Sequence, residues 1–120
     1  VTFVLQHALM PEDLSPSGLA AWRAALAALA RRRNVVAKLS GLGTFIHRND
    51  PAHIRDVVAA TLAAFGADRC LFGSNFPIEK LWTVYPELIA AYQSRPWRSA
   101  SSTPRPAGRC ASRLPSPARA

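Results

Sequence analysis

Three short apolar runs alternate with longer segments of helical periodicity along the chain. Residues 2–5, 35–39 and 70–72 are rich in β-branched and aromatic side chains, which is typical of buried strands. They recur about every 33 residues, and apolar residues at helical spacing follow each of them. Strand and helix therefore alternate, a pattern that predicts an α/β fold built from parallel βα units.

Start signals for the helices coincide with the beginning of each periodic segment. Ser15 is a suitable N-cap with Pro16 at the first helical position, and Asp50 and Pro51 form the same pair before the second segment. A third helix is expected to begin near Thr83. The expected buried faces consist of Leu19, Trp22, Leu26 and Leu29, of Ile54, Val57, Val58, Leu62 and Phe65, and of Leu88, Ile89 and Tyr92.

Length and charge divide the chain into two parts. Its 120 residues are enough for one small domain but not for a complete (β/α)8 barrel, which needs about 250 residues. Residues 1–93 hold nine Lys+Arg and seven Asp+Glu, a balance of +2, whereas residues 94–120 hold six Arg and no acid, a balance of +6. The second part also contains five Pro and six Ser. We expect a near-neutral body at residues 1–93 and a disordered basic tail at residues 94–120.

Two interpretations of the basic tail differ in what they imply for function. Its composition, rich in Arg, Pro, Ala and Ser and with one Gly, is typical of GC-rich codons translated out of frame. This favours a frameshift near the C-terminal end of the coding sequence. A basic arm that binds nucleic acid through phosphate neutralisation is the alternative. Because the tail has no Lys and offers only Trp97 for stacking on bases, nucleic acid is not the expected partner.

Neither membrane insertion nor secretion is indicated by the sequence. No apolar run approaches the roughly 18–20 residues that span a bilayer, and the first residues lack the basic segment of a signal peptide. Cys70 and Cys110 are too few for a disulfide framework and lack the CxxC spacing of zinc sites. We therefore expect a cytoplasmic protein without membrane contact.

Polar residues follow the end of each predicted strand. His7 comes after the first strand, Ser40 after the second, and Ser74 and Asn75 after the third. Because chemistry in parallel α/β folds gathers at the carboxyl ends of the strands, we expect these side chains on one rim, with His7 and Asn75 best suited to act on a substrate. The alternatives are a histidine that only hydrogen-bonds within its loop and an asparagine that only satisfies a tight turn.

Four further residues near this rim leave more than one role open. Lys38 points either into a pocket or to solvent. His47 lies in the loop after the second strand, where contact with a substrate is one possibility. Glu79 and Trp82 either line the mouth of a pocket or are an exposed acid and a packing indole. His53, in the first turn of the second helix, is expected on the surface.

Three motifs carry a family resemblance. They are QHA at residues 6–8, VAKLSG at residues 36–41 and LFGSNFP at residues 71–77. Together they resemble the last three βα units of the amidohydrolase-related TIM-barrel hydrolases, above all the branch with fuconolactonase-like and dicarboxylate lactonase-like enzymes. The resemblance covers residues 1–93 and implies strands six, seven and eight of a (β/α)8 barrel, which is incomplete in this chain.

The resemblance assigns roles to the rim residues. In that superfamily a histidine after the sixth strand binds a metal or polarises the substrate carbonyl, which is the role implied for His7. An acid after the eighth strand accepts a proton from the attacking water. Asn75 stands there instead, and its amide cannot accept a proton but can orient water or donate to an oxyanion. The resemblance also implies a divalent metal such as zinc in the full-length family, and substrate contacts by Lys38 and Ser40. His47 and Ser74, at the same rim, are further candidates for substrate contact.

The function implied by the resemblance is hydrolysis of a lactone or a related ester or amide bond in a small-molecule substrate. This chain would be a fragment of such a hydrolase, and a truncated or inaccurate gene product is compatible with that interpretation. A catalytic metal needs about three protein ligands, so a chain with His7 alone is expected to be inactive by itself. The alternative is a small non-catalytic module whose basic tail binds nucleic acid. The exposed strand edges of an incomplete barrel also offer a route to oligomers.

Overall fold

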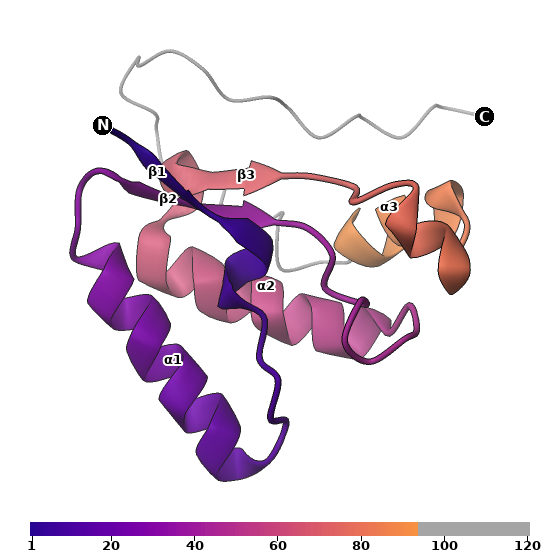
Figure 1. Cartoon of the computed structure of the whole chain (residues 1–120), viewed down its shortest axis with the longest axis horizontal. Helices are drawn as coiled ribbons and strands as arrows, with labels where there is room; N and C mark the ends of the chain where they lie inside the picture. The colour runs from indigo at the N-terminus through magenta and orange to yellow at the C-terminus, as the bar shows by residue number, and fades with distance from the viewer. Residues whose placement is uncertain (94–120) are drawn as a thin grey trace.

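A three-stranded parallel sheet forms the centre of the computed structural model, which describes residues 1–93 (Figure 1). β1 (Phe3–Leu5), β2 (Val35–Leu39) and β3 (Cys70–Phe72) lie in the order β1-β2-β3. Each strand pairs in parallel with the next one in the chain, and a helix forms each crossover connection. The predicted α/β fold of parallel βα units is confirmed, and β1 is one residue shorter than expected.

Three α-helices follow the strands in the predicted order. They are α1 (Pro16–Ala30), α2 (Pro51–Phe65) and α3 (Tyr85–Gln93), so α3 begins two residues after the expected position. The first two begin at the proline that follows a capping side chain, as predicted. Three short 3-10 turns were not predicted, namely η1 (Gln6–Leu9), η2 (Ala67–Arg69) and η3 (Ile78–Leu81).

The two faces of the sheet have different surroundings. Along β2, Val35, Ala37 and Leu39 are buried, while Val36 and Lys38 on the other face are only half-buried. Figure 1 shows α1 and α2 on the same side of the sheet, where they bury the first of these faces. Val4, the register partner of Val36, is 44% exposed. Within residues 1–93 the helices therefore cover one face of the sheet and leave the other open.

The outer strands pair on one side only within the described part of the chain. β1 and β3 each pair with β2, and Phe3 in β1 is 59% exposed. Unpaired strand edges are able to recruit a further strand. Oligomer formation through these edges stays a prediction.

Several expectations concern residues outside sheet and helices. None of the described helices is both long and apolar enough to cross a membrane. Cys70 is free and buried, and its burial raises the pKa of the thiol to about 11, as suits a packing residue rather than a nucleophile. Cys110, Trp97 and the predicted tail at residues 94–120 lie outside the described residues.

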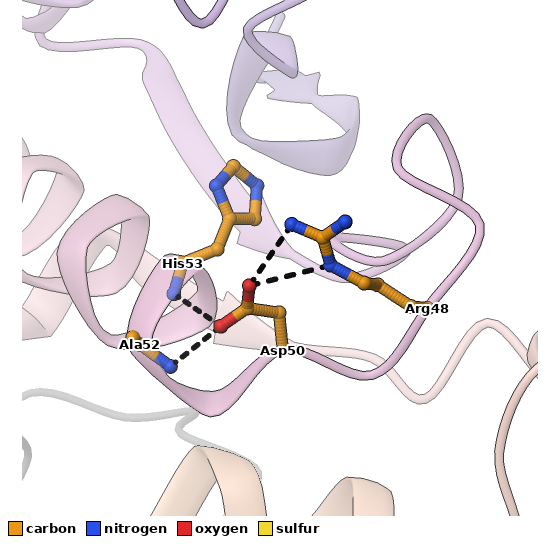
Figure 2. A network of polar contacts seen from close by, with 4 residues as sticks. All are labelled: Arg48, Asp50, Ala52 and His53. Carbon is orange, nitrogen blue, oxygen red and sulfur yellow. Dashed lines mark hydrogen bonds and ion pairs between the residues drawn. The ribbon is translucent and has the colours of Figure 1, made fainter.

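The start of α2 is fixed by the side chain of Asp50. Its Oδ1 accepts hydrogen bonds from the backbone N–H groups of Ala52 and His53 at 3.0 and 3.1 Å (Figure 2). Its Oδ2 accepts from the guanidinium of Arg48 at 3.3 Å. The hydrogen bond from His53, with smaller contributions from Arg48 and Ala52, holds the pKa of the Asp50 carboxyl below its usual range. The cap therefore places the loop that leads from β2 into α2.

Asp50→Ala is expected to lower the free energy of unfolding by about 1 kcal/mol at neutral pH, because two helix N–H groups lose their partner. The folded pKa of Asp50 lies below the unfolded value of about 3.9, so the contribution is present above that pH and is lost as pH falls through the folded pKa. Urea unfolding at pH 7 and at pH 3 measures both effects. Asp56→Ala is the control, since Asp56 is an exposed acid of the same helix that forms an ion pair with Arg55. An equal loss at both pH values would contradict the capping role.

Candidate active site

A left-handed turn carries His7 away from the end of β1. His7, Ala8 and Leu9 have φ angles of 54°, 51° and 57°, in a region that residues other than glycine seldom occupy. Two contacts hold this turn. The indole Nε1 of Trp22 in α1 donates to the Ala8 carbonyl at 3.0 Å, and the N–H of Met10 donates to the His7 carbonyl at 2.9 Å. Packing against α1 therefore stabilises a backbone conformation that the local sequence does not favour.

The imidazole of His7 is oriented by Ser40, which follows β2. Nδ1 of His7 lies 3.0 Å from the Ser40 carbonyl oxygen and 2.9 Å from its Oγ. A carbonyl oxygen only accepts, so a hydrogen on Nδ1 satisfies this contact, and a neutral imidazole with that hydrogen has its lone pair on Nε2. Ser40 is 0% exposed. Its position favours orientation of the imidazole over direct contact with a ligand.

Gly41 is the point at which the ends of all three strands meet. It has a φ of +60°, and a Cβ added there would lie 2.7 Å from His7 Nδ1 and 2.9 Å from Asn75 Nδ2. His7 and Asn75 thus approach the same Cα atom from β1 and β3, on either side of β2. The three polar segments that follow the strands come together at one rim, which we call the carboxyl rim. Its members in the following paragraphs are His7, Lys38, Ser40, Gly41 and Asn75.

Lys38 reaches this rim across the open face of the sheet. A Cβ added to Gly73 would lie 2.5 Å from Lys38 Cε and 3.2 Å from Ser40 Cβ, so both side chains pack on the glycine. Lys38 is half-buried there. Ser74, also expected at the rim, uses its Oγ to accept from the backbone N–H of Phe76 at 3.3 Å. Lys38 therefore brings a positive charge beside Ser40, whereas the Ser74 hydroxyl supports the turn after β3.

Glu79 contacts the carboxyl rim through Asn75, and its burial was not predicted from the sequence. The sequence left open an exposed acid or a pocket lining residue, but the side chain is 0% exposed. Its carboxylate accepts from Thr44 Oγ1 at 2.9 Å, from Trp82 Nε1 at 2.8 Å and from Asn75 Nδ2 at 3.3 Å. The carboxylate thereby joins the loop after β2 to the loop after β3. Its spacing of four residues from Asn75 and three from Trp82 is the signal that the sequence offered.

His47 is placed beside Trp82. The two rings are stacked with centroids 5.1 Å apart and planes inclined by 21°, and His47 is exposed with a φ of 52°. Trp82 in turn donates to Glu79, which binds Asn75. Trp82 and Glu79 thus connect His47 to Asn75 at the carboxyl rim. His47 itself lies in the loop after β2, farther from the strand ends than Ser40 and Gly41 in the sequence.

A cavity of about 250 Å³ lies elsewhere, between α1 and α2. Its lining includes Leu19 and Trp22 from α1, and Asp50, His53 and Val57 from the beginning of α2. None of the five members of the carboxyl rim lines it. His53, which was expected on the surface, is half-buried here because its side chain faces this cavity. The charged residues that line the cavity include Arg48 and Asp50, which form an ion pair at the N-cap of α2.

His7 has features that metal-binding histidines share. His7 offers the lone pair of Nε2, and its Nδ1–H bond to a backbone carbonyl is the support that metal-binding histidines usually have. Within residues 1–93 no three His, Cys, Asp or Glu side chains are grouped so that they could hold a metal ion. Catalytic zinc takes about three protein ligands. His7 therefore fits the role of one ligand, and the described residues do not form a complete site.

Comparison with known proteins identifies relatives of this arrangement. A family profile described as amidohydrolase matches residues 1–109, and so continues beyond the described residues. The chain is 40% identical over 93 residues to y4mH, an uncharacterized protein of Sinorhizobium fredii, with 78% of this chain covered. It is 40% identical over 97 residues to an L-fucono-1,5-lactonase of Burkholderia multivorans, with 72% of this chain covered.

A solved structure has the same arrangement of elements. An amidohydrolase from Burkholderia multivorans with bound zinc aligns with a TM-score of 0.70 and 36% identity, over 82% of this chain and 40% of that one. The chain spans only 31% and 33% of the lengths of the two curated relatives above. The three βα units thus match part of a larger barrel.

Proposed function

The chain belongs to the amidohydrolase family, and on that premise we propose that its carboxyl rim is part of the active site of a hydrolase that opens a lactone or a related ester or amide. The observation that carries this proposal is that His7 and Asn75, which follow the two strands flanking β2, approach the same point beside Gly41. Side chains from three strands meet at the end of the sheet where parallel α/β enzymes hold their substrates. Relatives named as L-fucono-1,5-lactonases support a small, hydroxylated lactone as the substrate class.

The tautomer of His7 favours one of the roles that the resemblance implied. With the hydrogen on Nδ1, the free Nε2 accepts a proton or binds a metal, and it does not donate a hydrogen bond to a substrate carbonyl. A divalent metal, when bound, would supply a Lewis acid and an activated water. His7 is the residue of this chain that would contribute a ligand to it. Lys38, whose ammonium extends across the open face, suits an anionic group of the substrate or product.

The chain by itself is expected to lack hydrolytic activity, because within residues 1–93 the carboxyl rim offers one imidazole where about three protein ligands are needed. Hydrolysis of L-fucono-1,5-lactone by the purified chain, with and without added zinc, measures this directly. Turnover that disappears in His7→Ala would contradict the expectation of inactivity.

A chimera tests the proposed function itself. Residues 1–93 replace the matching segment of the Burkholderia multivorans L-fucono-1,5-lactonase, and lactone hydrolysis is assayed. The chimera is expected to be active and to lose about 10²–10⁴-fold in kcat on His7→Ala. His53→Ala in the same chimera is the control, because His53 lines the separate cavity and should leave kcat unchanged. A folded chimera whose activity is insensitive to His7→Ala would overturn the proposal.

Nucleic-acid binding, cellular location and oligomer formation stay predictions. Nucleic-acid binding by a basic tail depends on residues 94–120, which lie outside the described residues, and the family match does not favour it. A cytoplasmic location and an oligomer formed through strand edges also stay predictions.

A further inference from the structure

The amide nitrogen of Asn75 faces two acceptors. Nδ2 donates to Thr44 Oγ1 at 3.2 Å and to Glu79 Oε1 at 3.3 Å. The hydroxyl hydrogen of Thr44 is given to the same Oε1 of Glu79 at 2.9 Å, so Thr44 Oγ1 accepts from Asn75. Asn75, Thr44 and Glu79 are thus hydrogen-bonded to one another, and the donor and acceptor of each bond are fixed.

The carboxylate of Glu79 sets this direction. An ionised carboxylate only accepts, so the atom of Asn75 that faces it must be the nitrogen. Rotating the amide by half a turn would place Asn75 Oδ1 against Glu79 Oε1 and leave two acceptors in contact. Glu79 cannot turn away, because it is 0% exposed and its other oxygen accepts from Trp82 Nε1 at 2.8 Å.

We propose that Glu79 is a positioning residue that holds the NH2 group of Asn75 toward Glu79 and Thr44 and leaves its carbonyl oxygen free to accept a hydrogen bond from the substrate. Within residues 1–93 no group donates a hydrogen bond to Asn75 Oδ1. This oxygen is also not one of the buried polar atoms without a partner, so it is accessible. This oxygen is therefore an open acceptor on a side chain of the carboxyl rim, whose nitrogen lies beside Gly41. The reference to a substrate rests on the proposed function, whereas the orientation of the amide does not.

The orientation decides what Asn75 recognises. An acceptor binds a hydroxyl, an ammonium or a water molecule, and it repels the oxyanion that develops on a lactone carbonyl. Of the two roles left open by the sequence, orientation of water or of a substrate hydroxyl is favoured over donation to an oxyanion. A polyhydroxylated lactone provides such hydroxyl groups, and a substrate without donors would leave Oδ1 unpaired.

The same contact explains why an amide stands at position 75. An aspartate there would place a second carboxylate about where Nδ2 now lies, 3.3 Å from Glu79 Oε1. Two carboxylates sharing a buried site repel each other strongly. The acid at position 79 and the amide at position 75 are thus a matched pair, and exchanging their chemical types should preserve the contact.

Thermal unfolding of four full chains tests the pair: the natural chain, Asn75→Asp, Glu79→Gln and the double variant. Asn75→Asp is expected to lower Tm by roughly 10 °C at pH 7, because two carboxylates then face each other. The double variant should recover at least half of that loss, since the amide of Gln at position 79 can donate to Asp at position 75. Glu87→Gln, at an exposed acid of α3, is the control and should leave Tm unchanged.

A spectroscopic measurement accompanies the melting experiment in case a variant does not fold. In the natural chain at least one Nδ2 proton of Asn75 should exchange slowly with solvent in ¹⁵N-resolved NMR, and Glu79→Gln should speed its exchange while Glu87→Gln does not. A double variant no more stable than Asn75→Asp, or Nδ2 protons that exchange freely in the natural chain, would overturn the positioning role. Neither readout requires hydrolysis, so failure of the lactonase chimera would be recognised separately.

Discussion

Trp22→Ala is expected to lower the free energy of unfolding by about 3–5 kcal/mol, because truncating a buried indole leaves a cavity that the surroundings fill only in part. Trp22 is 7% exposed and belongs to the core formed with α2 and the sheet. Its Nε1 also donates to the Ala8 carbonyl, so the substitution removes the contact that holds the left-handed turn at His7. The loss of stability and the release of His7 should occur together.

Trp22→Phe separates the hydrogen bond from the packing. Phenylalanine keeps most of the apolar contact but leaves the Ala8 carbonyl without its donor, which costs about 1–3 kcal/mol for a buried group. Urea unfolding of both variants, followed by circular dichroism, gives the two free energies. Equal stabilities of Trp22→Phe and the natural chain would show that the indole N–H does not hold the turn.

Gly41→Ala is expected to displace His7 and Asn75 from the carboxyl rim. Its φ of +60° costs a residue with a Cβ about 1–2 kcal/mol, and the new methyl group would lie within 2.9 Å of both side chains. Forcing such neighbours apart typically costs a further 1–3 kcal/mol or so. In the lactonase chimera the same substitution should therefore reduce kcat, because the two side chains no longer share one site.

Gly66→Ala is the matched control for this effect. Gly66 also has a positive φ, of 74°, but nothing lies within 4 Å of an added Cβ. Both substitutions strain the backbone, and only Gly41→Ala should shift the ¹⁵N signals of the His7 imidazole and the Asn75 amide. Unchanged His7 signals in Gly41→Ala would contradict the close approach of the three strand ends.

The elements that could be predicted are those with local signals. A capping residue followed by proline marks the start of each of the first two helices: Ser15 and Pro16 for α1, and Asp50 and Pro51 for α2. Both helices begin at the proline in the structure. The parallel order of the strands followed from their regular spacing, since each helix between them must cross over. These signals depend only on residues that are close in the sequence, so the helix starts and the strand order could be predicted without the structure.

The parts that escaped prediction depend on contacts distant in sequence. The left-handed turn at His7 is held by Trp22, 15 residues along the chain. Glu79 is buried because Thr44, 35 residues earlier, and Trp82 donate to it. A glutamate among Pro, Ile and Lys looks like a solvated residue until the loop from β2 is placed beside it. The meeting of His7 with Asn75 was foreseeable from strand ends, whereas the direction of the amide was not.

The central claim is that the segments after β1, β2 and β3 bring His7, Ser40 and Asn75 to one rim. The most direct measurement is a set of nuclear Overhauser contacts in the full chain between the His7 ring, the Gly41 α-protons and the Asn75 side-chain amide. We predict cross-peaks from Gly41 to both side chains. A spectrum that contains the parallel pairing of β1 with β2 and of β2 with β3 but lacks contacts from Gly41 to His7 and to Asn75 would contradict the claim.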